Sequence, residues 1–188
     1  MGRLINSTYV SLDGAVQHPE RFTFGFRSDD GAKYAHDLLY SADAVLMGKN
    51  TYDAFAAVWP TANDEAGLAE RMNALPRYVV SDTLTDPSWA NTHVIPRADA
   101  RDRVRRLKSE FGTIVQYGFG PVTTDLLGAG LVDEIRLWIH PVLVGASDPA
   151  ELISYTHPAA RLELLDVVRC TSGLLILVYR PATEVADA

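Results

Sequence analysis

Short apolar segments alternate along this chain with segments whose apolar residues recur at helical spacing, and this alternation constrains the fold most. Residues 44–47 are apolar without interruption, which is typical of a strand covered on both faces. Residues 98–111 place Val104, Leu107 and Phe111 on one helical face, and Gly112 is suited to end that helix. The pattern predicts repeated strand–helix units and therefore a largely parallel sheet.

The full set of predicted elements defines the fold class. Strands are predicted at residues 4–10, 44–47, 77–81, 92–95, 113–116 and 134–140. Helices are predicted at 29–42, 51–57, 63–75 and 98–111, and a turn followed by a helix at 118–130. Two β-rich runs, 162–168 and 174–179, flank a turn and predict a C-terminal antiparallel hairpin. We expect a three-layer α/β domain over residues 1–181, with an antiparallel hairpin at one sheet edge and a frayed tail at 182–188.

Composition excludes several classes of function. The 188 residues suit one domain, and a net charge of −7 disfavours a nucleic-acid or membrane surface. Cys170 is the only cysteine, so the chain has no intramolecular disulfide and no cysteine-rich metal site, and we expect no metal. No apolar run reaches the ~20 residues of a membrane span, and no leader pattern opens the chain, so we expect a cytoplasmic protein.

Two glycine turns each follow a buried strand and lead into a predicted helix. They are Met47-Gly48-Lys49-Asn50-Thr51-Tyr52 and Gln116-Tyr117-Gly118-Phe119-Gly120-Pro121. Glycine lets a backbone approach a phosphate, and the free N–H groups of a helix start bind anions. Either turn taken singly is better explained as a tight turn. Together at the carboxyl edge of one sheet they indicate a dinucleotide site, although the G-x-G-x-x-G pattern is absent.

Several of these segments resemble known reductases. The Gly48 segment is similar to the Met-Gly-Arg-x-Thr-Trp segment of dihydrofolate reductases, as are the strand ending at Ser81 and the turn 118–120. Residues 11–14, 130–134 and 140–145 resemble the reductase domain of the bifunctional deaminase-reductase of riboflavin biosynthesis. The resemblance covers nearly the whole chain and implies a dihydrofolate-reductase-like fold that binds NADPH.

The resemblance also implies which residues bind the cofactor. They are Gly48, Lys49, Thr51, Ser81, Arg97, Gly118, Phe119 and Gly120. A cation at Lys49 could pair with the adenosine 2′-phosphate, whereas Arg97 is equally well explained as a solvated loop charge. Asp82 stands where relatives often carry a basic residue, and its carboxylate would repel that phosphate. NADH therefore stays an alternative cofactor.

The substrate side offers fewer signals. Asp13 follows the first strand, where a carboxylate could bind an amino-pyrimidine or relay a proton, but an ordinary turn before Gly14 explains it equally well. Phe22, Phe24 and Phe26 alternate in the next loop and form either an aromatic lid or, as we favour, part of the core.

Further candidate residues have equally simple structural explanations. Trp59 either lines the pocket or buries its ring at the rim, and His140 is expected to be a core or interface residue. Asp29 and Asp30 open the helix that bears the pteridine-binding carboxylate of dihydrofolate reductases, and both fit ordinary helix-start charges.

Together these features predict an NADPH-dependent reductase of a small heterocycle, resembling 5-amino-6-(5-phosphoribosylamino)uracil reductase. The alternatives are a dihydrofolate reductase and a non-catalytic ligand-binding protein. The zinc site of the deaminase half is excluded, because Cys170 stands alone. The sequence after Gly145 departs from the riboflavin-type pattern, so the resemblance does not identify the substrate.

A homodimer is also expected. Residues 174–178 are apolar without interruption, so both faces of an edge strand would need cover. The cover is either a second subunit, which we favour, or residues 149–160 of the same chain.

Overall fold

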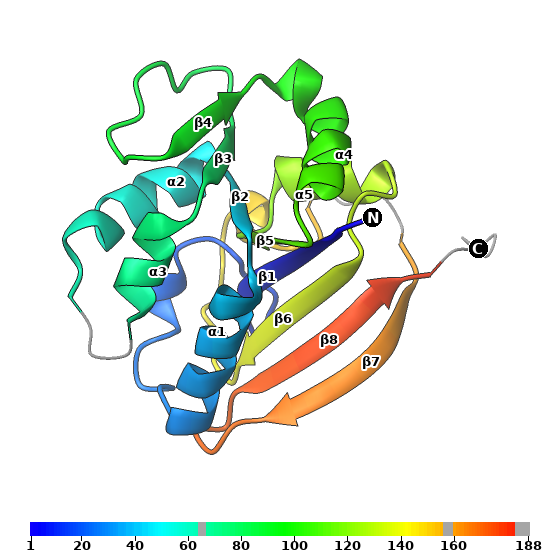
Figure 1. The fold of residues 1–188 in the computed structure, drawn as a ribbon. Helices are drawn as coiled ribbons and strands as arrows, with labels where there is room; N and C mark the ends of the chain where they lie inside the picture. Colours follow the sequence, from blue (N-terminus) through cyan, green and yellow to red (C-terminus); the bar gives the residue numbers. More distant parts are fainter. Residues whose placement is uncertain (64–66, 156–159, 183–188) are drawn as a thin grey trace.

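Eight strands form one sheet in the computed structural model, which describes residues 1–63, 67–155 and 160–182 (Figure 1). The strand order is β4-β3-β2-β5-β1-β6-β8-β7. The strands are β1 Arg3–Ser11, β2 Ala44–Gly48, β3 Arg77–Val80, β4 Thr92–Ile95, β5 Thr113–Tyr117, β6 Glu134–His140, β7 Leu162–Arg169 and β8 Leu175–Pro181. β1 to β6 pair in parallel, β8 is antiparallel to β6, and β7 is antiparallel to β8, which confirms the predicted fold class.

Helices cover both faces of the sheet. They are α1 Asp29–Ser41, α2 Lys49–Ala56, α3 Leu68–Ala74, α4 Ala100–Glu110 and α5 Pro121–Gly128. Short 3-10 turns lie at Pro19–Arg21, Trp59–Thr61, Arg97–Asp99 and Pro149–Glu151. Leu4, Leu46 and Ile114 pack with α4 and α5, whereas their strand neighbours Ile5 and Val45 pack with α1, α2 and α3. Alternate residues of each strand thus enter different cores, as expected for a sheet between two helical layers.

Several predicted boundaries differ from the structure by a few residues. The helix predicted at 63–75 begins only at Leu68, because Gly67 has a φ of 74° and interrupts the helical backbone; residues 64–66 lie outside the described part. The helix predicted at 98–111 is the 3-10 turn Arg97–Asp99 followed by α4. Most of the predicted frayed tail, residues 183–188, also lies outside the described part.

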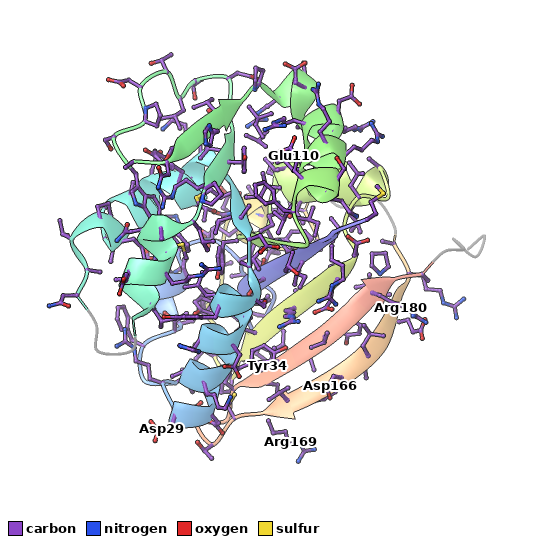
Figure 2. All side chains as sticks on the ribbon, viewed as in Figure 1. Asp29, Tyr34, Glu110, Asp166, Arg169 and Arg180 are labelled. Carbon is purple, nitrogen blue, oxygen red and sulfur yellow. The ribbon has the colours of Figure 1, made fainter. Side chains whose placement is uncertain are left out.

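The C-terminal hairpin is covered unequally on its two faces. On one face Trp138, Leu174 and Ile176 are buried against α1, with Tyr34 packed beside them. In Figure 2 Tyr34 of α1 lies over the sheet beside β8, and Asp166 lies on the outer strand β7. The opposite face of β7 leaves Leu164 51% and Val167 42% exposed. Among the described residues, no helix has the length and apolar character needed to span a bilayer.

Candidate functional site

Four neighbouring strands end at the same level of the sheet. Gly48 of β2 pairs with Val80 of β3, and Val80 pairs with Ile95 of β4. On the other side Met47 pairs with Tyr117, so the turn at Gly118 begins level with Gly48. At about 4.8 Å between strands, these ends form a platform roughly 15 Å long. The carboxyl ends of parallel strands are where α/β proteins bind ligands.

The two glycine turns are in contact on this platform. Gly118 has a φ of 81°, and a Cβ placed on it would overlap the Oγ1 atom of Thr51 in the first turn of α2. A Cβ on Gly48 would lie 3.5 Å from Val122 of α5. A Cβ on Gly120 would meet no atom within 4 Å, so this side of the turn is open. The starts of α2 and α5 therefore converge beside an open backbone turn, which is a suitable cradle for a phosphate group.

A buried polar network supports the Gly118 turn from below. The amide of Asn6, which is fully buried in β1, donates from Nδ2 to the carbonyl oxygen of Gly118 at 2.8 Å, and Thr8 donates to Asn6 Oδ1 at 2.9 Å. Thr123 of α5 donates to the same carbonyl at 3.3 Å, and Gln116 Nε2 donates to Thr123 Oγ1 at 3.0 Å. The carbonyl of Gly118 thus accepts hydrogen bonds from β1 and α5, which fix the orientation of this backbone group, and Gln116 of β5 holds Thr123 in place.

The cations expected to meet a 2′-phosphate already have carboxylate partners. Lys49 Nζ lies 2.6 Å from Asp53 Oδ2, one helical turn away in α2. Arg97 donates its backbone N–H to Asp82 Oδ1 at 2.9 Å, and its Nε lies 3.9 Å from Asp82 Oδ2. Both pairs are partly exposed to solvent. Exposed ion pairs are weak and exchange readily, so either cation can turn to a bound phosphate.

Ser81 holds the chain at the end of β3. It is buried, and its hydroxyl oxygen accepts the backbone N–H groups of Thr83 at 3.1 Å and Leu84 at 3.0 Å. This hydroxyl shapes the turn between β3 and the Asp82 loop. Phe119, between the two glycines of the second turn, is buried, with 8% of its surface exposed.

Beside Gly118 the rings of Tyr117, Phe55 and Trp59 form a row, which we call the aromatic wall. Ser7 of β1 pairs with Tyr117, and β1 continues beyond this level to Ser11, which pairs with His140. The ring of Tyr117 lies 5.5 Å from that of Phe55, and Phe55 lies 6.1 Å from Trp59. Phe55 thus contacts both Tyr117 and Trp59, the residue that the sequence analysis gave as a pocket candidate.

His140 is a core residue, as expected from its apolar neighbours. Its Nδ1 lies 2.9 Å from the carbonyl oxygen of Trp138, to which it donates. The rings of Tyr9, Phe22 and Phe26 surround it at 5.3, 5.4 and 6.0 Å. Burial lowers the pKa of His140, so the imidazole is neutral at physiological pH.

The phenylalanine loop divides between core and solvent. Phe22 is buried and Phe26 half-buried against His140, which places these two in the core. Phe24 lies between them and is 69% exposed, next to Gly25, which has a φ of 91°. The loop thus presents one aromatic ring to solvent while its neighbours anchor it.

Asp13 joins two loops at the end of β1. Ser11 donates to its Oδ1 at 2.6 Å, and the backbone N–H groups of Val144 and Gly145 donate at 3.2 and 2.8 Å. The hydrogen bond from Ser11, followed by that from Gly145, lowers the pKa of Asp13 to about 2. An ionised carboxylate with three donors is well suited to hold the turn and poorly suited to donate a proton at neutral pH.

Sequence reasoning did not identify Asn6, Tyr9 or Tyr117. A usable signal existed for Asn6, because the run Asn6-Ser7-Thr8 interrupts a strand that should be apolar on both faces. Buried polar residues need partners, so such an interruption points to a hydrogen-bond network. The ring contacts of Tyr9 and Tyr117 depend on which elements are neighbours, and the sequence pattern does not give this.

Comparison with known proteins agrees with this architecture. The chain is 27% identical over 181 residues to the uncharacterized protein YyaP of Bacillus subtilis, covering 94% of each. Its fold is shared with a putative riboflavin biosynthesis protein of Shewanella (TM-score 0.68, 16% identity, 96% of this chain and 99% of that one). It is also shared with a pyrimidine reductase-like protein of Corynebacterium diphtheriae (TM-score 0.66, 16% identity, 97% and 93%). The family model described as the RibD C-terminal domain matches residues 3–176, so this chain belongs to that family.

Proposed function

We propose that this protein is a reductase that uses NADPH to reduce a small heterocyclic substrate. The observation that carries the proposal is the platform of four level strand ends, on which two glycine turns are in contact. When bound, the cofactor supplies the hydride, and the protein supplies binding and orientation. Membership of the RibD C-terminal domain family supports the same reading.

The proposed cofactor site follows the platform from one end to the other. The pyrophosphate lies over Gly118, Phe119 and Gly120 and against the first turn of α2 at Gly48 and Thr51. The adenosine extends over the ends of β3 and β4, towards Ser81, Lys49 and Arg97. The open side of Gly120 and the exchangeable ion pairs of both cations fit this arrangement.

The substrate is proposed to lie beyond Gly118, beside the aromatic wall. Trp59 and Tyr117 are half-buried, and we propose that a planar heterocycle stacks against their rings. Phe24 is 69% exposed and can cover it. Asp13 orients the loop after β1 rather than transferring a proton. Structures that share this fold include a protein of Thermotoga maritima described as a diaminohydroxyphosphoribosylaminopyrimidine deaminase/5-amino-6-(5-phosphoribosylamino)uracil reductase, of which this chain spans 57%. We propose a substrate of the class that the reductase part is named for.

A dihydrofolate-type substrate is less well supported. Asp30, one of the two acids that open α1, accepts the backbone N–H of Thr171 at 2.7 Å and that of Gly31 at 2.9 Å. Its carboxylate is thus tied to the hairpin turn, where it stabilises the start of α1.

The functional unit is proposed to be a homodimer. Leu164 and Val167 form an exposed apolar row on β7, continued by the half-buried Leu177 and Tyr179 of β8. The described part of the segment that could cover the hairpin instead pairs with the β1 turn, because Ile153 donates to Gly14 and Val16 donates to Glu151. A second subunit would remove this row from water.

Loss of nicotinamide absorbance tests the activity directly. The protein is incubated with NADPH and a panel of phosphoribosylamino-pyrimidines and pterins, and a reaction without substrate is the control. We expect oxidation with a pyrimidine substrate and none without substrate. Failure of the unmodified protein to bind either NADPH or NADH would refute the proposal.

A further inference from the structure

The carboxylates beside the adenosine end of the platform have no role in the proposal so far. We propose that Asp53 and Asp82 set the preference between NADPH and NADH, by neutralising the cations Lys49 and Arg97. The inference rests on the proposed function, because it assumes that the adenosine lies over the ends of β2, β3 and β4. The sequence alone indicated that Asp82 would repel a 2′-phosphate; the structure adds Asp53 and shows that each acid is paired with one of the two candidate cations.

The register of the strands brings both pairs to one end of the platform. Lys49 directly follows Gly48, and Asp82 lies two residues after Val80, which pairs with Gly48. Arg97 lies two residues after Ile95, which pairs with Val80. The two ion pairs therefore follow three adjacent strands, within the reach of one nucleotide.

The two pairs differ in how firmly the acid is held. Asp53 contacts Lys49 only through flexible side chains, which are 50% and 37% exposed. Asp82 is anchored to the backbone N–H of Arg97 at 2.9 Å, whereas the guanidinium of Arg97 is 3.9 Å away and 61% exposed. When a phosphate approaches, the Arg97 side chain can swing towards it, but the Asp82 carboxylate stays. Asp82 is therefore the stronger determinant.

Each carboxylate cancels the charge of its cation, and this weakens the preference for NADPH over NADH. A 2′-phosphate carries a charge of about −1.5 to −2 at neutral pH, so it gains from the cations and loses to the carboxylates. NADH lacks this phosphate and leaves both pairs intact. At ~5 Å in water, each carboxylate repels such a phosphate enough to change affinity roughly three- to tenfold. We expect the unmodified protein to bind NADP⁺ and NAD⁺ within about tenfold of each other on the same argument.

Binding titrations of NADP⁺ and NAD⁺ test the inference without any substrate. The variants are Asp53→Asn and Asp82→Asn, since asparagine keeps the shape and, at position 82, the acceptor for the Arg97 N–H. Asp37→Asn is the matched control, because Asp37 forms a Lys33 pair with the same i,i+4 spacing on α1. The measured quantity is the ratio of the NAD⁺ and NADP⁺ dissociation constants.

The ratio should rise roughly three- to tenfold in favour of NADP⁺ in Asp82→Asn, less in Asp53→Asn, and stay unchanged in Asp37→Asn. At 1 M salt these differences should shrink, because exposed charges are screened. An unchanged ratio in both test variants, with both nucleotides still bound, would overturn the inference and leave the proposed function standing. If the unmodified protein binds neither nucleotide, the proposed function itself fails.

Discussion

Replacing Gly118 with alanine should damage the protein in two separable ways. The first is backbone strain, because Gly118 has a φ of 81°. An L-residue in this left-handed region costs about 1–2 kcal/mol. The second is overlap, since the new methyl group would collide with Thr51 Oγ1. Forcing an extra carbon into a packed contact costs about 1–3 kcal/mol.

The chain contains a control that isolates the strain. Gly130 has a φ of 66°, but a Cβ there would meet no atom within 4 Å. Gly130→Ala should therefore lower the free energy of unfolding by only about 1–2 kcal/mol, whereas Gly118→Ala should lower it by about 2–5 kcal/mol. For a chain of this size, each kcal/mol lowers the melting temperature by roughly 2–4 °C.

A double-mutant cycle with Thr51→Ala separates the second contribution. Thr51→Ala removes Oγ1, the atom that the new methyl group would overlap. In the Gly118→Ala background it should therefore restore about 1–3 kcal/mol of the free energy of unfolding. Urea denaturation of the four proteins gives the coupling energy. If Gly118→Ala costs no more than Gly130→Ala, or if the coupling is near zero, the two glycine turns are not in contact as described.

Three further predictions concern the network, the acid response and assembly. Asn6→Leu removes the donor to the Gly118 carbonyl. It should lower the free energy of unfolding, measured in urea, by about 1–3 kcal/mol and weaken NADPH binding in titrations. If neither value changes, Asn6 does not support the Gly118 turn. The pKa of Asp13 is lowered from 3.8 to about 2, so its stabilisation is present above about pH 4 and is lost as the pH falls towards 2. Melting temperatures should show this acid loss, and Asp13→Asn should flatten it; an identical acid profile in the variant would exclude Asp13 as its source. Light scattering should give twice the 20.6 kDa chain mass, and Leu164→Glu should give the monomer, whereas a monomeric unmodified protein would contradict the hairpin interface.

The strands and their alternation with helices were predictable because buried segments have a recognisable pattern of apolar residues. Ala44–Gly48 is short and apolar because helices cover both of its faces, and Ile114 and Val115 of β5 are buried for the same reason. The helix predicted at 63–75 was wrong in extent because apolar spacing continued across Gly67, whose backbone leaves the helical region. Periodicity records which face is buried, whereas a boundary depends on a single backbone angle.

The candidate site was predictable only in part, for a related reason. The glycine turns could be found because glycine marks a backbone constraint that a side chain would violate. The carboxylate partners of Lys49 and Arg97 were harder to find. Asp53 is one helical turn from Lys49 and visible in the sequence, but Asp82 meets Arg97 only because β3 and β4 are neighbours. Such contacts depend on strand order.

A crystal structure of the protein with NADPH tests the central claim most directly. We expect the pyrophosphate to lie against the backbone of residues 118–120 and the start of α2. The adenosine should lie over the ends of β2, β3 and β4, and the nicotinamide beside Tyr117. A nucleotide bound at any other surface, or a Gly118 turn that makes no contact with it, would contradict the account.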